Sequence, residues 1–116
     1  MDVNEVIGRC ATDGELRVFL RFSGTVQGVG FRWTMQQLAN EQGVVGWVQN
    51  MDDGTVEAEL QGHGRAIACV LEGIRDQFAD ARRRYSMLSH LHFSVAAFER
   101  RVPRTVSGGA RFEVRA

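Results

Sequence analysis

The feature that most constrains the fold of this chain is a strand pattern that leads through a glycine-rich loop directly into a helix pattern. In residues 16–23 apolar and mostly polar side chains alternate, as a strand with one buried face requires. Residues 24–30 contain three glycines, and apolar side chains then recur at helical spacing in residues 31–39. Gly43 suits the left-handed residue that ends many helices. This part of the chain is therefore predicted to fold as strand, loop and helix.

The next segment predicts a β-hairpin. Strands are expected over residues 44–50 and 55–61, and the tetrapeptide between them contains the pair Asp53-Gly54, which favours a tight turn. The side chains of the second strand that are expected to face the core are Val56, Ala58 and Leu60.

Three further elements complete the pattern. A second helix is expected from Ile67 to about Ala81, because apolar residues recur there every three or four positions. Alternation predicts a fourth strand over residues 91–97 and a fifth at 112–115, after a loop that contains Pro103. This order, β-α-β-β-α-β plus a terminal strand, predicts a two-layer α+β sandwich with both helices on one face of the sheet.

The chain is predicted to form one domain, residues 16–116, preceded by an N-terminal extension, residues 1–15, which we take as polar and aperiodic. At 116 residues folding removes roughly two thirds of the unfolded surface from water, enough for a core without metal or disulfides. Cys10 and Cys69 are too few for a disulfide framework and have no partner at metal-ligand spacing. Without a signal-peptide pattern or a membrane-spanning apolar stretch, we expect a cytoplasmic protein that does not contact membranes.

Composition excludes several kinds of chemistry. All 14 basic residues are Arg, so no lysine is present for a Schiff base, a pyridoxal phosphate or a GxxxxGK nucleotide loop. The formal net charge is zero, which gives no bulk attraction to nucleic acid. Residues 1–62 carry 9 acids and 4 Arg, whereas residues 63–116 carry 5 acids and 10 Arg. Because both halves are expected to interleave in one sheet, we do not interpret this asymmetry as a binding face.

The glycine loop has the composition of a phosphate-binding loop. Backbone N–H groups at the start of a helix attract anions, and glycine lets the backbone approach them closely because it has no Cβ. Arg32, in the first turn of the predicted helix, can bind two oxygens of one anion with its planar guanidinium. The residues predicted to bind phosphate are Thr25, Val26, Gln27, Gly28, Val29, Gly30 and Arg32. On spacing alone, a tight turn followed by a solvated arginine is the commoner arrangement.

Two short motifs in this region resemble those of a known family. Residues 24–32 read Gly-Thr-Val-Gln-Gly-Val-Gly-Phe-Arg, and residues 43–50 read Gly-Val-Val-Gly-Trp-Val-Gln-Asn. In order and separation they resemble the acylphosphatase family, whose signature is GxVQGVxFR followed by GxxGWVxN. The resemblance is strong over residues 17–62 and loose over residues 112–115.

The resemblance implies a ferredoxin-like sandwich with an antiparallel or mixed sheet, and an enzyme that hydrolyses acyl phosphates to a carboxylate and inorganic phosphate. Water is then the nucleophile, no metal, cofactor or covalent intermediate takes part, and inorganic phosphate is both product and competitive inhibitor. The catalytic residues carried over are Arg32, which binds phosphate, and Asn50, which orients the water. Some members have a hydroxyl residue after the asparagine, where this chain has Met51. We expect a monomer whose substrate is a small acyl phosphate.

Two other functions stay open at this point. An RNA-recognition module has the same order of elements, but it stacks bases on aromatic side chains of its third strand, and residues 55–61 contain none. A non-catalytic accessory domain of this fold occurs at the front of larger proteins that resemble the hydrogenase-maturation carbamoyltransferases. The end of this chain after its fifth strand disfavours that alternative.

Several other residues have a structural interpretation that we prefer. Cys69 and Arg75 have the C-x5-R spacing of cysteine phosphatases, yet a helical periodicity runs through both, so Cys69 is expected in the core. His90 and His92 have no third metal ligand at matching spacing. The cluster Arg82–Arg84 suits the C-terminus of a helix, whose dipole favours positive charge.

Two tryptophans and two glutamates complete the candidates. Trp47 is expected to be a core residue, whereas Trp33, beside the predicted phosphate-binding arginine, is open between a structural role and ligand stacking. Glu57 and Glu59 are expected on the exposed face of their strand, where they need no role beyond solubility.

Overall fold

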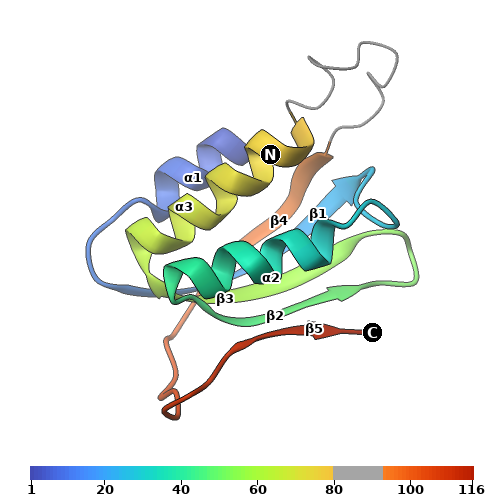
Figure 1. Ribbon diagram of the computed structural model, residues 1–116. Helices are drawn as coiled ribbons and strands as arrows, with labels where there is room; N and C mark the ends of the chain where they lie inside the picture. The colour runs from blue at the N-terminus through green and yellow to red at the C-terminus, as the bar shows by residue number, and fades with distance from the viewer. Residues whose placement is uncertain (80–92) are drawn as a thin grey trace.

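The computed structural model describes residues 1–79 and 93–116, in which helices cover one face of a five-stranded sheet (Figure 1). Its elements are α1 Val3–Cys10, β1 Glu15–Gly24, α2 Phe31–Gln42, β2 Val45–Asn50, β3 Val56–His63, α3 Gly64–Ile74, β4 Phe93–Arg101 and β5 Phe112–Arg115. A π-helical turn, Arg75–Ala79, extends α3, and the expected helix end near Ala81 lies outside the described residues. The predicted two-layer α+β sandwich is confirmed.

The topology of the sheet brings three strand ends together. The strand order is β4-β1-β3-β2-β5, and neighbours are antiparallel except β2 and β5, which are parallel. Because β1 and β2 are both antiparallel to β3, strands β1, β2 and β5 run in the same direction. Their C-terminal ends therefore meet at one end of the sheet. The loop after β1, the last residue of β2 and the last residues of β5 all lie there.

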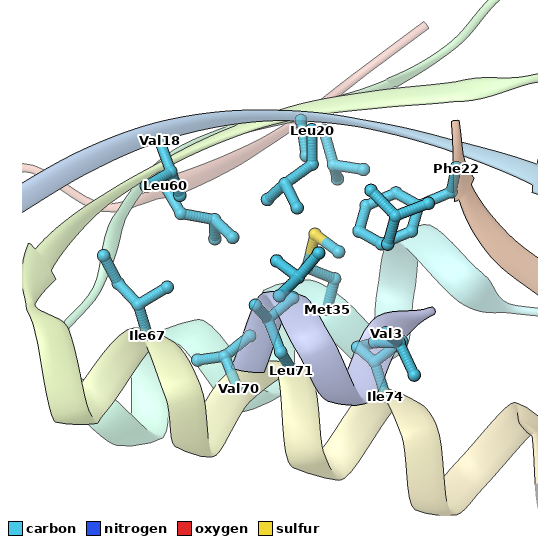
Figure 2. Close-up of a cluster of buried hydrophobic side chains, with 14 of the residues drawn as sticks. Val3, Val18, Leu20, Phe22, Met35, Leu60, Ile67, Val70, Leu71 and Ile74 are labelled. Atoms are coloured by element: carbon cyan, nitrogen blue, oxygen red, sulfur yellow. The ribbon is translucent and has the colours of Figure 1, made fainter. Parts of the chain in front are cut away.

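The hydrophobic core fills the space between the sheet and the helices (Figure 2). Alternate residues of β1 and β3 point into it, and α3 meets them with one apolar face, as the sequence patterns predict. The fully buried side chains of these three elements include Val18, Leu20, Phe22, Val56, Ala58, Leu60, Ile67, Val70, Leu71 and Ile74.

An aromatic cluster fixes the start of α2. Phe31, the first residue of this helix, lies with its ring centroid 5.0 Å from that of Phe22 in β1 and 5.6 Å from that of Phe93 in β4. Both pairs are edge-to-face, the arrangement that aromatic rings prefer. The glycine loop thus leads into a helix whose first residue is held in the core.

The N-terminal segment differs from the expectation. Instead of being aperiodic, it forms α1, capped by the Asp2 carboxylate, which accepts a hydrogen bond from Asn4 N (2.7 Å). Its buried residues, Val3, Val6, Ile7 and Cys10, follow the spacing of one helix face and belong to the same core as the sheet. The helix packs beside α3, so three helices rather than two cover the sheet in the described part of the chain (Figure 1).

One glycine of the second motif is required by close packing between strands. Gly46 in β2 has a φ of 138°, and a Cβ at this position would lie 1.8 Å from the carbonyl oxygen of Glu59 in β3. No larger residue fits without moving one strand away from the other. Gly46 therefore sets the approach of β2 to β3, and with it the course of β2 toward Asn50.

The outer face of the sheet carries a buried charge network, which the sequence interpretation missed. The expectation that Glu59 is exposed is wrong, because its side chain is only 3% exposed. Glu59 accepts hydrogen bonds from Arg17 and from Arg101 Nη1 (2.6 Å). Gln61 extends the network through its side-chain amide. The amide oxygen accepts hydrogen bonds from Arg17 and from Arg104 N, and the amide nitrogen donates one to Arg104 O. The chain that follows β4 thus lies against this face at Gln61.

The hydrogen bonds and charges of this network lower the pKa of the Glu59 carboxyl. Burial raises the pKa of the carboxyl, but the hydrogen bonds and positive charges of Arg101 and Arg17 lower it by more, so the pKa lies below its ordinary value of 4.5. A carboxyl with a lowered folded-state pKa stabilises the fold above its unfolded-state pKa. That contribution is lost as the pH falls through the folded-state value.

We predict that Glu59→Gln lowers the free energy of unfolding by roughly 2–4 kcal/mol at pH 7, because it leaves two arginines without their carboxylate. The difference from the parent protein should shrink as the pH falls below 4.5, because the unfolded parent then takes up a proton, and it should be lost once the pH is below the lowered pKa of the folded state. Urea unfolding between pH 3 and pH 7 measures both effects.

The matched control is Glu57→Gln. Glu57 is half-buried rather than exposed as expected, with 16% of its side chain exposed, but its partner Arg21 is 42% exposed. The cost of Glu57→Gln should stay below about 1 kcal/mol, as for other solvent-accessible ion pairs. Equal costs for the two variants would contradict a special role for Glu59.

Candidate active site

The loop between β1 and α2 presents a row of backbone N–H groups that lack partners. Gly28 and Gly30 adopt left-handed conformations, with φ of 75° and 82°. Within residues 1–79 and 93–116, the N–H groups of residues 27–30 meet no acceptor. Those of residues 31–33 are also unsatisfied, because the first bond of α2 runs from Thr34 N to Gly30 O (3.0 Å) and no side chain caps the helix.

A cavity of about 280 Å³ opens beside these groups, at the end of the sheet where β1, β2 and β5 finish. Loop, helix start and strand ends all contribute to its wall. The lining residues are Val26, Gly28, Gly30, Phe31, Arg32, Trp33, Gln36, Asn50 and Val114.

Arg32 brings the positive charge into this cavity. Its Nη1 donates a hydrogen bond to the carbonyl oxygen of Arg115 in β5 (2.6 Å), which fixes the guanidinium against the last strand. The remaining guanidinium N–H groups meet no acceptor in the described part of the chain, and no carboxylate there pairs with the charge. An uncompensated guanidinium beside unpartnered amides is a site for an oxyanion with several oxygens.

Asn50 contributes an acceptor to the same cavity. It is the last residue of β2, where it pairs with Val56 of β3. Its Oδ1 is buried and has no hydrogen-bond partner among the residues that the structure describes. Buried polar atoms are nearly always satisfied, so an orphaned acceptor in a cavity wall is suited to a hydrogen-bond donor from outside the protein. The cavity therefore combines donors for an anion with one acceptor for a donor such as water.

Comparison with known proteins identifies the family. The family model Acylphosphatase matches residues 18–84, more than half of the chain. The chain belongs to the acylphosphatase family. The match contains both sequence motifs and, with them, Arg32 and Asn50.

Individual acylphosphatases agree with this assignment. The chain is 48% identical over 56 residues to the acylphosphatase of Thermococcus kodakarensis, covering 48% of this chain and 62% of that protein. It is 42% identical over 76 residues to that of Geobacillus thermodenitrificans, covering 66% of this chain and 76% of that protein. The first of these alignments thus spans less than two thirds of the relative.

A solved structure extends the likeness to the fold. The crystal structure of the acylphosphatase from Bacillus subtilis superposes with a TM-score of 0.61 at 28% sequence identity. The superposition covers 87% of this chain and 99% of that one. The ferredoxin-like α+β architecture implied by the two motifs is therefore confirmed.

Only some of the predicted phosphate-binding residues line the cavity. Gly28, Gly30 and Arg32 line the cavity, whereas Thr25, Gln27 and Val29 are not among its lining residues. Val26 lines it with a buried side chain, but its N–H donates to Gly24 O (3.1 Å). The Val26 N–H thus has a partner within the loop, and phosphate binding by the seven residues stays a prediction.

Gln27 has a role that the sequence did not predict. Its Nε2 donates to the carbonyl oxygens of Met51 (2.8 Å) and Thr55 (2.9 Å), which belong to the turn directly after Asn50. Met51 N also donates to Thr55 O (2.9 Å), which closes this turn. The Gln27 side chain thus holds the glycine loop and Asn50 in a fixed relation.

Two contributions come from β5, which the motifs do not include. Val114 lines the cavity, and the Arg115 carbonyl holds Arg32. Gln36 of α2 donates to Phe112 O (3.2 Å), a second bond between this helix and the last strand. Only a pairing of β5 with β2 makes these contacts possible, and no local sequence signal predicts them.

Other expectations from the sequence have mixed outcomes. Cys69 lies on α3 as expected, but it is exposed, and Cys10 is the buried cysteine. Burial raises the pKa of the Cys10 thiol to about 11 despite the opposing charge of Arg100. Trp47 is half-buried rather than in the core as expected, with the Arg115 guanidinium 4.8 Å from its ring centroid.

Some candidates cannot be placed. His90, His92 and Arg82–Arg84 lie outside the described residues. In the parts that the structure does describe, no three His, Cys, Asp or Glu side chains are grouped as a metal ion would need. In the same parts, every helix is too short or too polar to cross a membrane.

We predict that removing Arg115 and Ala116 weakens the binding of inorganic phosphate at least about fivefold. The deletion removes the carbonyl that holds Arg32, and a hydrogen bond to a charged group contributes about 1–3 kcal/mol. Isothermal titration with phosphate measures the change. Arg115→Ala is the control, because it keeps the main-chain carbonyl and should bind phosphate like the parent protein. Equal affinity of the shortened chain and the parent would contradict this role of β5.

Proposed function

We propose that the protein is an acylphosphatase, which hydrolyses acyl phosphates to a carboxylate and inorganic phosphate without a metal or a covalent intermediate. The observation that carries this proposal is the orphaned Oδ1 of Asn50 in the same cavity as Arg32 and the unpartnered amides of the loop. Membership of the acylphosphatase family supports it.

The loop and Arg32 bind the phosphoryl group in this proposal. The N–H groups of residues 27–33 supply donors that need no rearrangement, because loop and helix already hold them in place. Arg32 compensates the dianion with two or more of its free N–H groups. Gly28 and Gly30 let the phosphoryl oxygens come close to the backbone.

Asn50 positions the nucleophile. A water molecule donates one hydrogen to Oδ1 of Asn50, which directs a lone pair of the water toward phosphorus. The new bond joins the water oxygen to phosphorus, and the bond between phosphorus and the acyl oxygen breaks with its electron pair leaving on the carboxylate. A phosphoryl oxygen of the substrate takes the proton of the water. Because the carboxylate is a good leaving group, positioning and charge stabilisation suffice.

The alternatives are less favoured. An RNA-recognition module needs exposed aromatic side chains on its third strand, and β3 contains no Phe, Tyr or Trp. A non-catalytic accessory domain would not need an orphaned acceptor beside an uncompensated cation. The expectations of a monomer and of a cytoplasmic location stay predictions.

Arg32→Ala should reduce kcat/KM for acetyl phosphate and benzoyl phosphate at least about a hundredfold, because the variant loses the charge that binds the phosphoryl group. Inorganic phosphate should also lose its competitive inhibition. Hydrolysis is assayed in the presence of EDTA. The control Arg9→Ala removes an exposed arginine of α1, far from the cavity, and should leave kcat/KM unchanged. Full activity of Arg32→Ala would disprove the proposed phosphate site.

Asn50→Ala should lower kcat at least about a hundredfold with little change in the inhibition constant of inorganic phosphate, because the phosphate donors remain and only the acceptor for water is lost. Asn4→Ala is the matched control on α1. If turnover by Asn50→Ala stayed near that of the parent, Asn50 would not position the water.

A further inference from the structure

The cavity has an apolar rim that the phosphoryl chemistry does not use. Trp33 is 65% exposed and Val114 is 40% exposed, and both line the cavity. A third exposed apolar residue, Val29, lies between two lining glycines. Exposed large apolar side chains next to one another commonly mark a binding surface.

The fold explains why the side chains of Trp33 and Val114 are neighbours in the cavity wall and are left uncovered. Val114 of β5 pairs with Val48 of β2, so both side chains point to the helix face of the sheet. Val48 and Phe112 are buried there, but α2 begins at Phe31 and does not cover Val114.

Two hydrogen bonds join α2 to β5 on either side of this uncovered position. Along α2 and β5, Arg32 bonds Arg115 O (2.6 Å) and Gln36 bonds Phe112 O (3.2 Å). Trp33 lies between the two donors in sequence, and Val114 lies between the two acceptors. The two apolar side chains therefore share the wall of the cavity between helix and strand.

Charge in the cavity is confined to one place. Among the lining residues that the structure describes, Arg32 is the only ionisable one, and the proposed function uses it for the phosphoryl group. An acyl group with a charge of its own would find no partner among the lining residues. An aromatic or branched apolar acyl group would instead cover Trp33 and Val114 and remove apolar surface from water.

We propose that Trp33 and Val114 form the acyl-group subsite, and that this enzyme prefers acyl phosphates with an aromatic or bulky apolar acyl group over small or charged ones. This inference rests on the proposed hydrolysis at the same cavity. It names the part of the substrate that the loop and Arg32 do not contact.

The test compares benzoyl phosphate with acetyl phosphate. For the parent protein, kcat/KM should be at least about tenfold higher with benzoyl phosphate. Trp33→Ala should lower the value for benzoyl phosphate about tenfold and leave that for acetyl phosphate within twofold. Trp33→Phe, which keeps an aromatic ring, should recover most of the loss. Val114→Ser should act like Trp33→Ala, and Val102→Ser, at a site 84% exposed and away from the cavity, should have no effect.

Binding without hydrolysis separates this inference from the proposed function. Phenylphosphonate and methylphosphonate carry a stable carbon–phosphorus bond, and calorimetric titration should show tighter binding of the phenyl compound, an advantage that Trp33→Ala removes. If the parent hydrolyses neither acyl phosphate, the proposed function fails, and the phosphonates still test the subsite. If Trp33→Ala affects both acyl phosphates equally, or the phenyl compound has no advantage, the subsite is disproved while hydrolysis stands.

Discussion

One hydrogen bond, from Arg32 Nη1 to the carbonyl oxygen of Arg115, joins the first turn of α2 to the last strand of the sheet. The bond uses a single N–H group and no charge, so the guanidinium keeps its remaining donors and its full positive charge. A carboxylate in the place of that carbonyl would hold the Arg32 side chain equally well but would neutralise the positive charge of its guanidinium. The position of Arg32 is thus fixed by a partner that does not compete with a bound anion.

The other polar groups around the cavity are also left available for a ligand. The amides of residues 27–33 and Oδ1 of Asn50 have no protein partner in the described residues. A buried unpartnered acceptor such as Oδ1 of Asn50 lowers stability, so the surrounding structure must hold it in place. Gln27 does so between loop and turn, Phe31 anchors the helix start in the core, and Gly46 sets the course of β2.

The local elements were predictable from the sequence because their signals are local. Alternation in β1, the glycine loop, the start of α2 and the Asp-Gly hairpin are all patterns of a few neighbouring residues. The side of the site formed by β5 was not predictable in the same way, because it depends on a strand pairing between residues more than 60 positions apart. Glu59 was misjudged for a related reason, since strand alternation places it on the outer face but does not show that Arg17 and Arg101 bond it there. In α1 the periodic signal was present at positions 3, 6, 7 and 10, and its polar neighbours concealed it.

The contact between the start of the chain and β4 affects more than packing. Strand β4 is at an edge of the sheet, where free N–H and C=O groups offer a template for another chain. The Met1 carbonyl oxygen accepts a hydrogen bond from Val95 N (3.0 Å), so one of these edge groups is already occupied. The segment that leads into α1 therefore occupies one position of this edge, where a foreign strand can no longer pair with Val95.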